Sequence, residues 1–284
     1  MTSLNDMHCH LGFMTNGEQV AVDARDAGTL LFCNTVSPGE WADARKRFAG
    51  FQNVIVGFGM HPWWVVGGNL VSKGSKERGE SQRAARKQLL ERARNRDVCE
   101  NPQAELQRAG VLSLLEEHEP RIIGEIGLDF GWSHADSYVE QLSMFSAIAS
   151  WAAGKGGRLL SIHSVRAAAE TFEVLENTGA IRSCTCAFHW FTGPSDLLKR
   201  AVKAGCLFSC GPRMLATGKG REYVKAIPDK QILLETDAPP EQGVPYSFAE
   251  LRFELESVAA SIAAIKGEGV LDTIAETSKA LLNT

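Results

Sequence analysis

The chain has 284 residues, of which 44% are hydrophobic and 23% are charged, and its net charge is −4 at pH 7. This is ordinary globular composition, and it excludes a chain that binds nucleic acid through an overall positive charge, although not one with a local basic surface. No apolar stretch approaches the roughly 18 residues of a membrane-spanning helix, whereas the length suits a single α/β barrel.

Short apolar or β-branched runs alternate with longer amphipathic stretches along the chain. These runs predict eight strands, at residues 4–10, 28–36, 53–60, 120–126, 158–163, 184–190, 205–210 and 231–237. A strand followed by a helix, repeated eight times, is typical of a parallel sheet closed into a (β/α)8 barrel. We therefore expect an α/β TIM barrel that forms a single domain over residues 1–284. A doubly wound open sheet is the alternative fold.

The segment between the third and fourth predicted strands is too long for one strand–helix unit. The surplus, about residues 67–103, predicts a charged insertion, and residues 73–100 hold nine Lys or Arg against five Asp or Glu. A solvated surface helix and a phosphate-contacting element both fit this pattern.

Histidines gather at the ends of the predicted strands. Near the start of the chain, Asp6, His8 and His10 would share one side of a strand, because alternate residues face the same way. Five of the seven histidines lie in or directly after predicted strands. They are His8, His10, His61, His163 and His189. The carboxyl ends of barrel strands are where active sites of this fold are built.

Two acids, Glu125 and Asp237, end apolar strands at the same level. A buried carboxylate needs a cation or several hydrogen-bond donors, and imidazole with carboxylate suits Zn²⁺, Mn²⁺ or Fe²⁺, with Mg²⁺ also fitting if water completes the shell. A lone strand histidine is more often a core residue, but this set is best neutralised by metal. Six ligands exceed the four that a tetrahedral ion takes, so two ions bridged by Glu125 would use them all.

The motifs DMHCHL, GMHP, GEIGLDF, IHS, FHWFTG and LLETDAP occur in this order along the chain. Together they resemble the motifs of the TatD family of metal-dependent deoxyribonucleases, which are amidohydrolase-like TIM barrels. The resemblance extends from residue 4 to about residue 240. The sequence departs from the family pattern at Val165, where an arginine is usual, at Trp190, where a cysteine is usual, and in lacking a later Arg-Asn-Glu-Pro motif.

The resemblance implies a role for each motif residue. His8, His10 and Asp237 would hold one divalent metal ion, and His163 and His189 would hold a second. Glu125 would bridge the two ions, which would be Zn, Mn or Mg. His61 would lie near the scissile group and contact phosphate.

We therefore expect a phosphodiesterase that cleaves single-stranded or frayed DNA ends through a metal-activated water. Catalysis would involve Asp237, Glu125 and His61, and Arg213 would join His61 in binding phosphate. The first alternative is an amidohydrolase-like hydrolase of a small amide, lactone or ester. The second is a catalytically silent protein that binds nucleic acid or a protein partner through the basic insertion.

Two further expectations concern the tryptophans after the predicted strands and the cellular location of the chain. Tryptophans 63, 64, 132 and 190 follow predicted strands and could stack on bases of a single strand or pack under loops. The seven cysteines are odd in number and most lie in apolar runs, and residues 1–20 lack the pattern of a secretory signal. We therefore expect reduced thiols, a cytoplasmic location and no membrane association.

Overall fold

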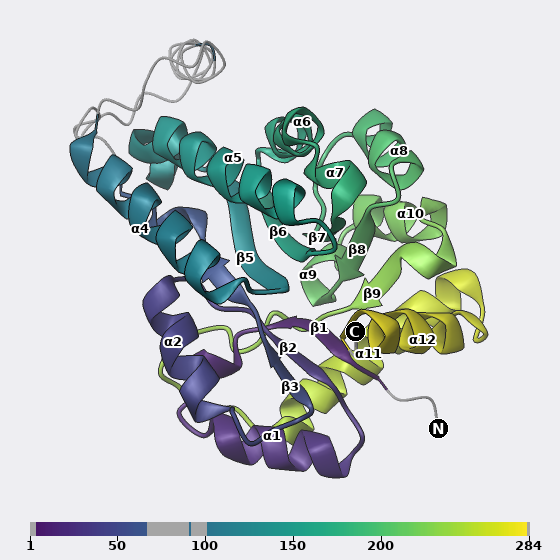
Figure 1. Ribbon diagram of the computed structural model, residues 1–284. Coiled ribbons are helices and arrows are strands. Elements are labelled where there is room, and N and C mark those ends of the chain that lie inside the picture. Colours follow the sequence, from purple (N-terminus) through teal and green to yellow (C-terminus); the bar gives the residue numbers. More distant parts are fainter. Residues whose placement is uncertain (1–3, 67–90, 92–100, 283–284) are drawn as a thin grey trace.

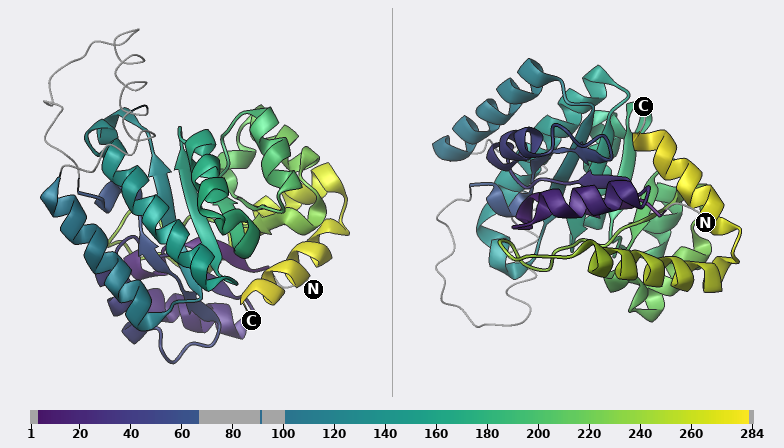
Figure 2. Two further views of the ribbon diagram at one scale, coloured as in Figure 1. Left: turned by 45° about the horizontal axis from the view of Figure 1, so that its top comes forward. Right: turned by 90° about the horizontal axis from the view of Figure 1, so that it is seen from below.

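The structure is a computed structural model that describes residues 4–66, 91 and 101–282. Within these residues the strands lie at the centre and the helices surround them (Figures 1 and 2). The strands are β1 (Asp6–Cys9), β2 (Leu31–Cys33), β3 (Val54–Val56), β4 (Phe58–Met60), β5 (Ile122–Asp129), β6 (Leu159–Val165), β7 (Thr185–His189), β8 (Leu207–Cys210) and β9 (Ile232–Leu234). Every pair of neighbouring strands is parallel, in the orders β1-β2-β3 and β4-β5-β6-β7-β8-β9.

Helices follow the strands in chain order, as the sequence predicts. They are α1 (Gly17–Asp26), α2 (Pro38–Arg47), α4 (Pro102–His118), α5 (Tyr138–Lys155), α6 (Ala168–Thr178), α7 (Ala180–Ser183), α8 (Ser195–Lys203), α9 (Pro212–Leu215), α10 (Gly218–Ala226), α11 (Phe248–Lys266) and α12 (Val270–Leu282). Short 3-10 turns precede or follow the strands, η1 (Leu11–Phe13), η2 (Pro62–Trp64), η3 (Trp132–Ser137) and η4 (Asp229–Gln231). No helix among the described residues is long and apolar enough to cross a membrane.

Backbone hydrogen bonds join the two sets of strands into a ring. Beyond β2, Thr35 N–H donates to the Gly124 carbonyl at 3.0 Å and Glu125 N–H donates to the Thr35 carbonyl at 2.8 Å. On the other side, His10 N–H donates to the Ala238 carbonyl at 2.7 Å and Asp237 N–H to the His8 carbonyl at 2.9 Å. The alternative of an open doubly wound sheet is therefore wrong, and the chain folds as an α/β barrel.

The predicted strand at 53–60 is two short strands. Gly57 separates β3 from β4 and donates its N–H to the Cys33 carbonyl at 3.0 Å. A Cβ atom at Gly57 would lie 2.7 Å from the Phe32 ring, so only glycine fits there. The last predicted strand, 231–237, is too long, because Asp237 has a left-handed backbone with φ 60° that no strand can continue.

The predicted insertion, about 67–103, falls between β4 and β5. Asn101 caps helix α4 and the last two residues begin that helix, and apart from Glu91 the rest of the insertion is outside the described residues. The interpretations offered for this segment therefore stay predictions.

The interior of the barrel changes character along its axis. An apolar cluster fills the amino-terminal half, with Leu159, Ala187, Leu207 and Leu233 among its members. Because side chains alternate along a strand, residues two positions further on face the same interior. These residues are Ser161, His189, Ser209 and Glu235, all of them buried and polar. The interior is therefore apolar near the amino-terminal ends of the strands and polar near their carboxyl ends. We call this polar region of the interior the polar cup.

Candidate metal-binding active site

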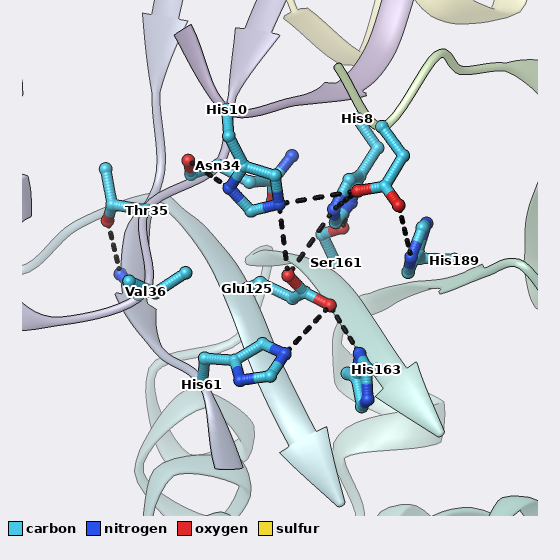
Figure 3. A network of polar contacts seen from close by, with 12 residues as sticks. His8, His10, Asn34, Thr35, Val36, His61, Glu125, Ser161, His163 and His189 are labelled. Atoms are coloured by element: carbon cyan, nitrogen blue, oxygen red, sulfur yellow. Dashed lines mark hydrogen bonds and ion pairs between the residues drawn. The ribbon is translucent and has the colours of Figure 1, made fainter. Parts of the chain in front are cut away.

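Five histidines and two acids from six strands meet in the polar cup. Glu125, on β5 and only 2% exposed, lies at the centre of the group. Its Oε2 faces His8 and His10, and its Oε1 faces His61 and His163 (Figure 3). One buried carboxylate therefore has two imidazoles at each oxygen.

In the first half of the site, two histidines each lie close to two carboxylate oxygens. The Glu125 Oε2 atom lies 3.5 Å from His8 Nε2 and 3.4 Å from His10 Nε2. The Asp237 Oδ1 atom lies 3.8 Å from His8 Nε2 and 3.5 Å from His10 Nε2. Donors that sit about 2.0–2.2 Å from one tetrahedral metal ion are about 3.3–3.6 Å apart. His8, His10 and Asp237 therefore form one group that could hold a metal ion, and Glu125 Oε2 lies beside both of these histidines.

His8 supplies an independent test of that fit. Its ring is fully buried, and its Nε2 atom has no hydrogen-bond partner. Its Nδ1 atom lies 2.9 Å from Ser161 Oγ, which orients the ring. Burial is the main reason that the pKa of His8 is lowered, so the ring is neutral and can offer a lone pair. An unpaired buried polar atom is costly, and a cation at Nε2 would remove that cost.

His10 is oriented by the backbone. Its Nδ1 lies 3.2 Å from the Asn34 carbonyl oxygen, which can only accept, so Nδ1 carries a proton. Burial lowers the pKa of His10, but hydrogen bonds with Asp237 and Glu125 outweigh burial and raise this pKa to about 10. A metal ion at Nε2 must therefore displace a proton from that atom.

The second half of the site has a different arrangement. His163 Nδ1 lies 2.7 Å from Glu125 Oε1, and His61 Nε2 lies 3.6 Å from the same oxygen. His189 stacks on His8 with ring centroids 3.9 Å apart, and its Nε2 lies 4.0 Å from Asp237 Oδ2. Among the described residues the potential ligand groups are His8 with His10 and Asp237, His8 with Glu125 and His189, and His61 with Glu125 and His163. His163 and His189 face the same cup but fall in different groups.

Two buried acids that the sequence did not single out hold these outer histidines. Glu235 Oε2 lies 2.8 Å from His189 Nδ1 and also accepts the hydroxyl of Ser209. Asp129 Oδ2 lies 3.3 Å from His163 Nε2. Glu235 lies two residues before Asp237 in the run ETD, and Asp129 lies four residues after Glu125 in the run GEIGLD. This even spacing from a predicted site acid is the only sequence signal for them.

Asp6 has a structural role instead of facing a metal with His8 and His10. Its Oδ2 accepts the Thr236 hydroxyl at 2.6 Å, and its Oδ1 accepts the backbone N–H of Thr236 and of His8, each at 3.1 Å. Burial raises the pKa of Asp6 to about 7 against the lowering effect of these hydrogen bonds. Asp6 is in none of the potential ligand groups among the described residues, and β1 pairs irregularly with β2 between Asp6 and Cys9, so simple alternation along this strand does not bring Asp6 to the metal-facing set.

The rim of the cup carries a cation and aromatic rings. Arg213 Nη1 lies 3.0 Å from Asp237 Oδ2, and its guanidinium lies 5.3 Å from the centroid of the Trp190 ring. The Arg213 side chain is 55% exposed, and Trp63 and Trp64 are 53% and 41% exposed. The side chain of Trp132 is outside the described part of the chain.

Comparisons with known proteins agree with the motifs. A family model described as TatD related DNase matches residues 5–283. A mouse protein named putative deoxyribonuclease TATDN3 is 28% identical over 247 residues, covering 83% of this chain and 72% of the mouse protein. A Mycobacterium tuberculosis protein named uncharacterized metal-dependent hydrolase TatD is 34% identical over 128 residues, covering 42% of this chain and 47% of that protein. The crystal structure of YJJV, a TatD homologue from Escherichia coli, has a TM-score of 0.72 at 18% identity and covers 100% of this chain and 99% of its own, which supports the barrel fold. Because the family model spans nearly the whole sequence, the chain belongs to the TatD related DNase family.

Proposed function

We propose that this chain is a metal-dependent hydrolase that cleaves phosphodiester bonds of DNA. The observation that carries the proposal is the buried Glu125 carboxylate, with two imidazoles at each of its oxygens. The names of relatives, deoxyribonuclease and metal-dependent hydrolase, support the same activity.

We propose two divalent ions, Zn, Mn or Mg, as cofactors. His8, His10 and Asp237 would hold the first ion together with Glu125 Oε2. His163 and His189 would hold the second, and Glu125 would be shared between the two ions. When bound, such ions lower the pKa of a coordinated water toward about 7 and polarise phosphoryl oxygens.

His61 is better suited to donate a hydrogen bond than to bind metal. Its Nδ1 accepts the backbone N–H of Trp63 at 3.1 Å, so a neutral ring carries its proton on Nε2. Burial lowers the pKa of His61 to about 3, which keeps the ring neutral at pH 7. Its Nε2–H points toward Glu125 and can donate to a phosphate oxygen or to the leaving group.

Asp237 and Arg213 would act at the mouth of the cup. The Asp237 side chain is 16% exposed, more than the other proposed ligands. Burial raises its pKa, but the neighbouring histidines outweigh burial and keep the pKa low, so Asp237 stays ionised and can orient a water molecule. Arg213 would bind a phosphate oxygen once that oxygen replaces Asp237 as its partner.

The recessed position of the ligands bears on the substrate. Because these side chains are at most 16% exposed, the reacting phosphate has to enter the cup. A single strand or a frayed end enters a recess more easily than a duplex does, so we propose single-stranded DNA as the substrate. The basic segment 73–96, of which only Glu91 is among the described residues, would contact further phosphates or a protein partner, and replacing its Lys and Arg should reduce the salt dependence of binding.

The direct test is an activity assay on the full chain after chelation. Zn²⁺, Mn²⁺ and Mg²⁺ are titrated back in the presence of single-stranded oligonucleotides labelled at the 5′ or 3′ end. Metal-dependent cleavage supports the proposal, and the pattern of fragments separates exonuclease from endonuclease action. Turnover of a small ester, lactone or amide with intact DNA would favour the first alternative function. DNA binding that neither cleaves nor responds to metal would favour the second.

A further inference from the structure

We propose that Trp63, positioned by Asp129, forms a stacking subsite for one nucleobase beside the metal centre. The inference rests on the proposed action on single-stranded DNA and specifies how the strand is held. It concerns a ring at the rim of the cup and an acid that the proposed cleavage does not use.

The Trp63 ring is exposed and yet fixed. It is 53% exposed, but its indole N–H donates to Asp129 Oδ2 at 2.7 Å. Asp129 is only 4% exposed, and its Oδ1 accepts the backbone N–H of Gly131 at 2.7 Å. A large aromatic side chain that is held rigidly while half of it faces solvent is typical of a ligand contact, because a free surface tryptophan gains nothing from being fixed.

Trp63 contacts three histidine rings and is still 53% exposed to solvent. His134 stacks on Trp63 with ring centroids 5.1 Å apart and an interplanar angle of 14°. The rings of His61 and His163 approach it edge-on, at centroid distances of 4.9 and 6.4 Å. Trp63 and these three histidines therefore form one connected group of aromatic rings, which we call the aromatic wall. It extends from the metal-facing histidines to the solvent-exposed side of Trp63.

Asp129 links this wall to the reacting centre. The same oxygen that accepts the indole N–H lies 3.3 Å from His163 Nε2. Asp129 is itself held in place, because its other oxygen, Oδ1, accepts the backbone N–H of Gly131. Asp129 is thus a positioning residue that sets the distance between the stacked base and the scissile phosphate.

Stacking on these rings does not distinguish one base from another. Stacking on an aromatic ring is worth about 1–3 kcal/mol per base and tolerates all sequences, because every base has a π-face. The subsite should therefore recognise the presence of a base and not its identity.

The test is a double-mutant cycle between the protein and the oligonucleotide. The full chain and its Trp63→Ala and Trp63→Phe variants are compared on single strands that carry one abasic residue at successive positions. Phe253→Ala, which removes a 70% exposed ring on α11, is the matched control. Kd is measured by fluorescence anisotropy on chelated protein, where no cleavage interferes, and KM and kcat are measured with metal.

We expect Trp63→Ala to raise Kd and KM by about 5- to 150-fold, and this effect to vanish when one particular position is abasic. Trp63→Phe should keep part of the affinity, and Asp129→Ala should weaken the coupling while Asp129→Asn preserves part of it. Equal losses on abasic and intact strands, or no measurable binding by the chelated wild type, would overturn the subsite. If the wild type cleaves no DNA but Trp63→Ala still weakens binding at one position, the proposed activity fails and the subsite stands.

Discussion

Replacing Glu125 by glutamine removes one negative charge from the centre of the cup with almost no change of shape. In the wild type this charge serves four imidazoles, with contacts between 2.7 and 3.6 Å. Removing one partner of a buried charge pair costs about 3–5 kcal/mol, because the remaining charge is left uncompensated. If the charges left uncompensated are two bound metal ions, the variant should bind metal about 10²–10⁴-fold more weakly.

The assay for Glu125→Gln is isothermal titration of Zn²⁺ or Mn²⁺ into chelated protein, followed by the oligonucleotide assay. Glu256→Gln, at an exposed glutamate paired with Arg252 on α11, is the control. We expect both the metal affinity and the cleavage rate to fall in the Glu125 variant alone. A variant that folds, binds metal as the wild type does and cleaves DNA at an unchanged rate would refute the reasoning.

Further predictions concern residues around Glu125. Asp6→Asn should make the free energy of unfolding less dependent on pH between about 4 and 7. The pKa of Asp6 is raised from 3.8 to about 7 in the folded chain, so the wild type is stabilised by the bound proton at low pH and loses this stabilisation as the pH rises. Urea unfolding at several pH values in that range measures the difference between variant and wild type. Glu235→Gln should lower metal affinity about 10–100-fold by loosening His189, and an unchanged affinity would contradict this. Arg213→Ala should raise KM for oligonucleotides while metal binding stays intact, which steady-state kinetics with titration calorimetry can separate. Adding metal to the chelated wild type should raise Tm by a margin that grows with metal concentration, whereas a constant Tm would mean that the folded chain holds no metal.

The sequence predicts the site well where a residue type and its strand position are enough. Parallel strands bring their carboxyl ends to one rim, so His8, His163 and Glu125 had to approach one another once the strands were placed. The split of residues 53–60 was not predictable, because it depends on the close approach of Gly57 to Phe32 across neighbouring strands.

Partner choice in the second half of the site could not be predicted for a different reason. Which ring nitrogen of His189 faces Glu235, and which of His163 faces Asp129, depends on side-chain orientation that no spacing encodes. The donor role of His61 likewise follows from one backbone N–H, that of Trp63, at its Nδ1. The sequence marks these residues as candidates, and only the packed structure separates ligands from the groups that hold them.

The most direct test of the account is a crystal of this chain soaked with Mn²⁺ and measured for anomalous scattering. We expect two peaks flanking the Glu125 carboxylate, one of them within about 2.0–2.3 Å of His8 Nε2, His10 Nε2 and Asp237. A single peak beside His8, His10 and Asp237 would agree with the first proposed ion and contradict the presence of a second. An empty cup, or manganese bound only elsewhere, would contradict the metal centre itself.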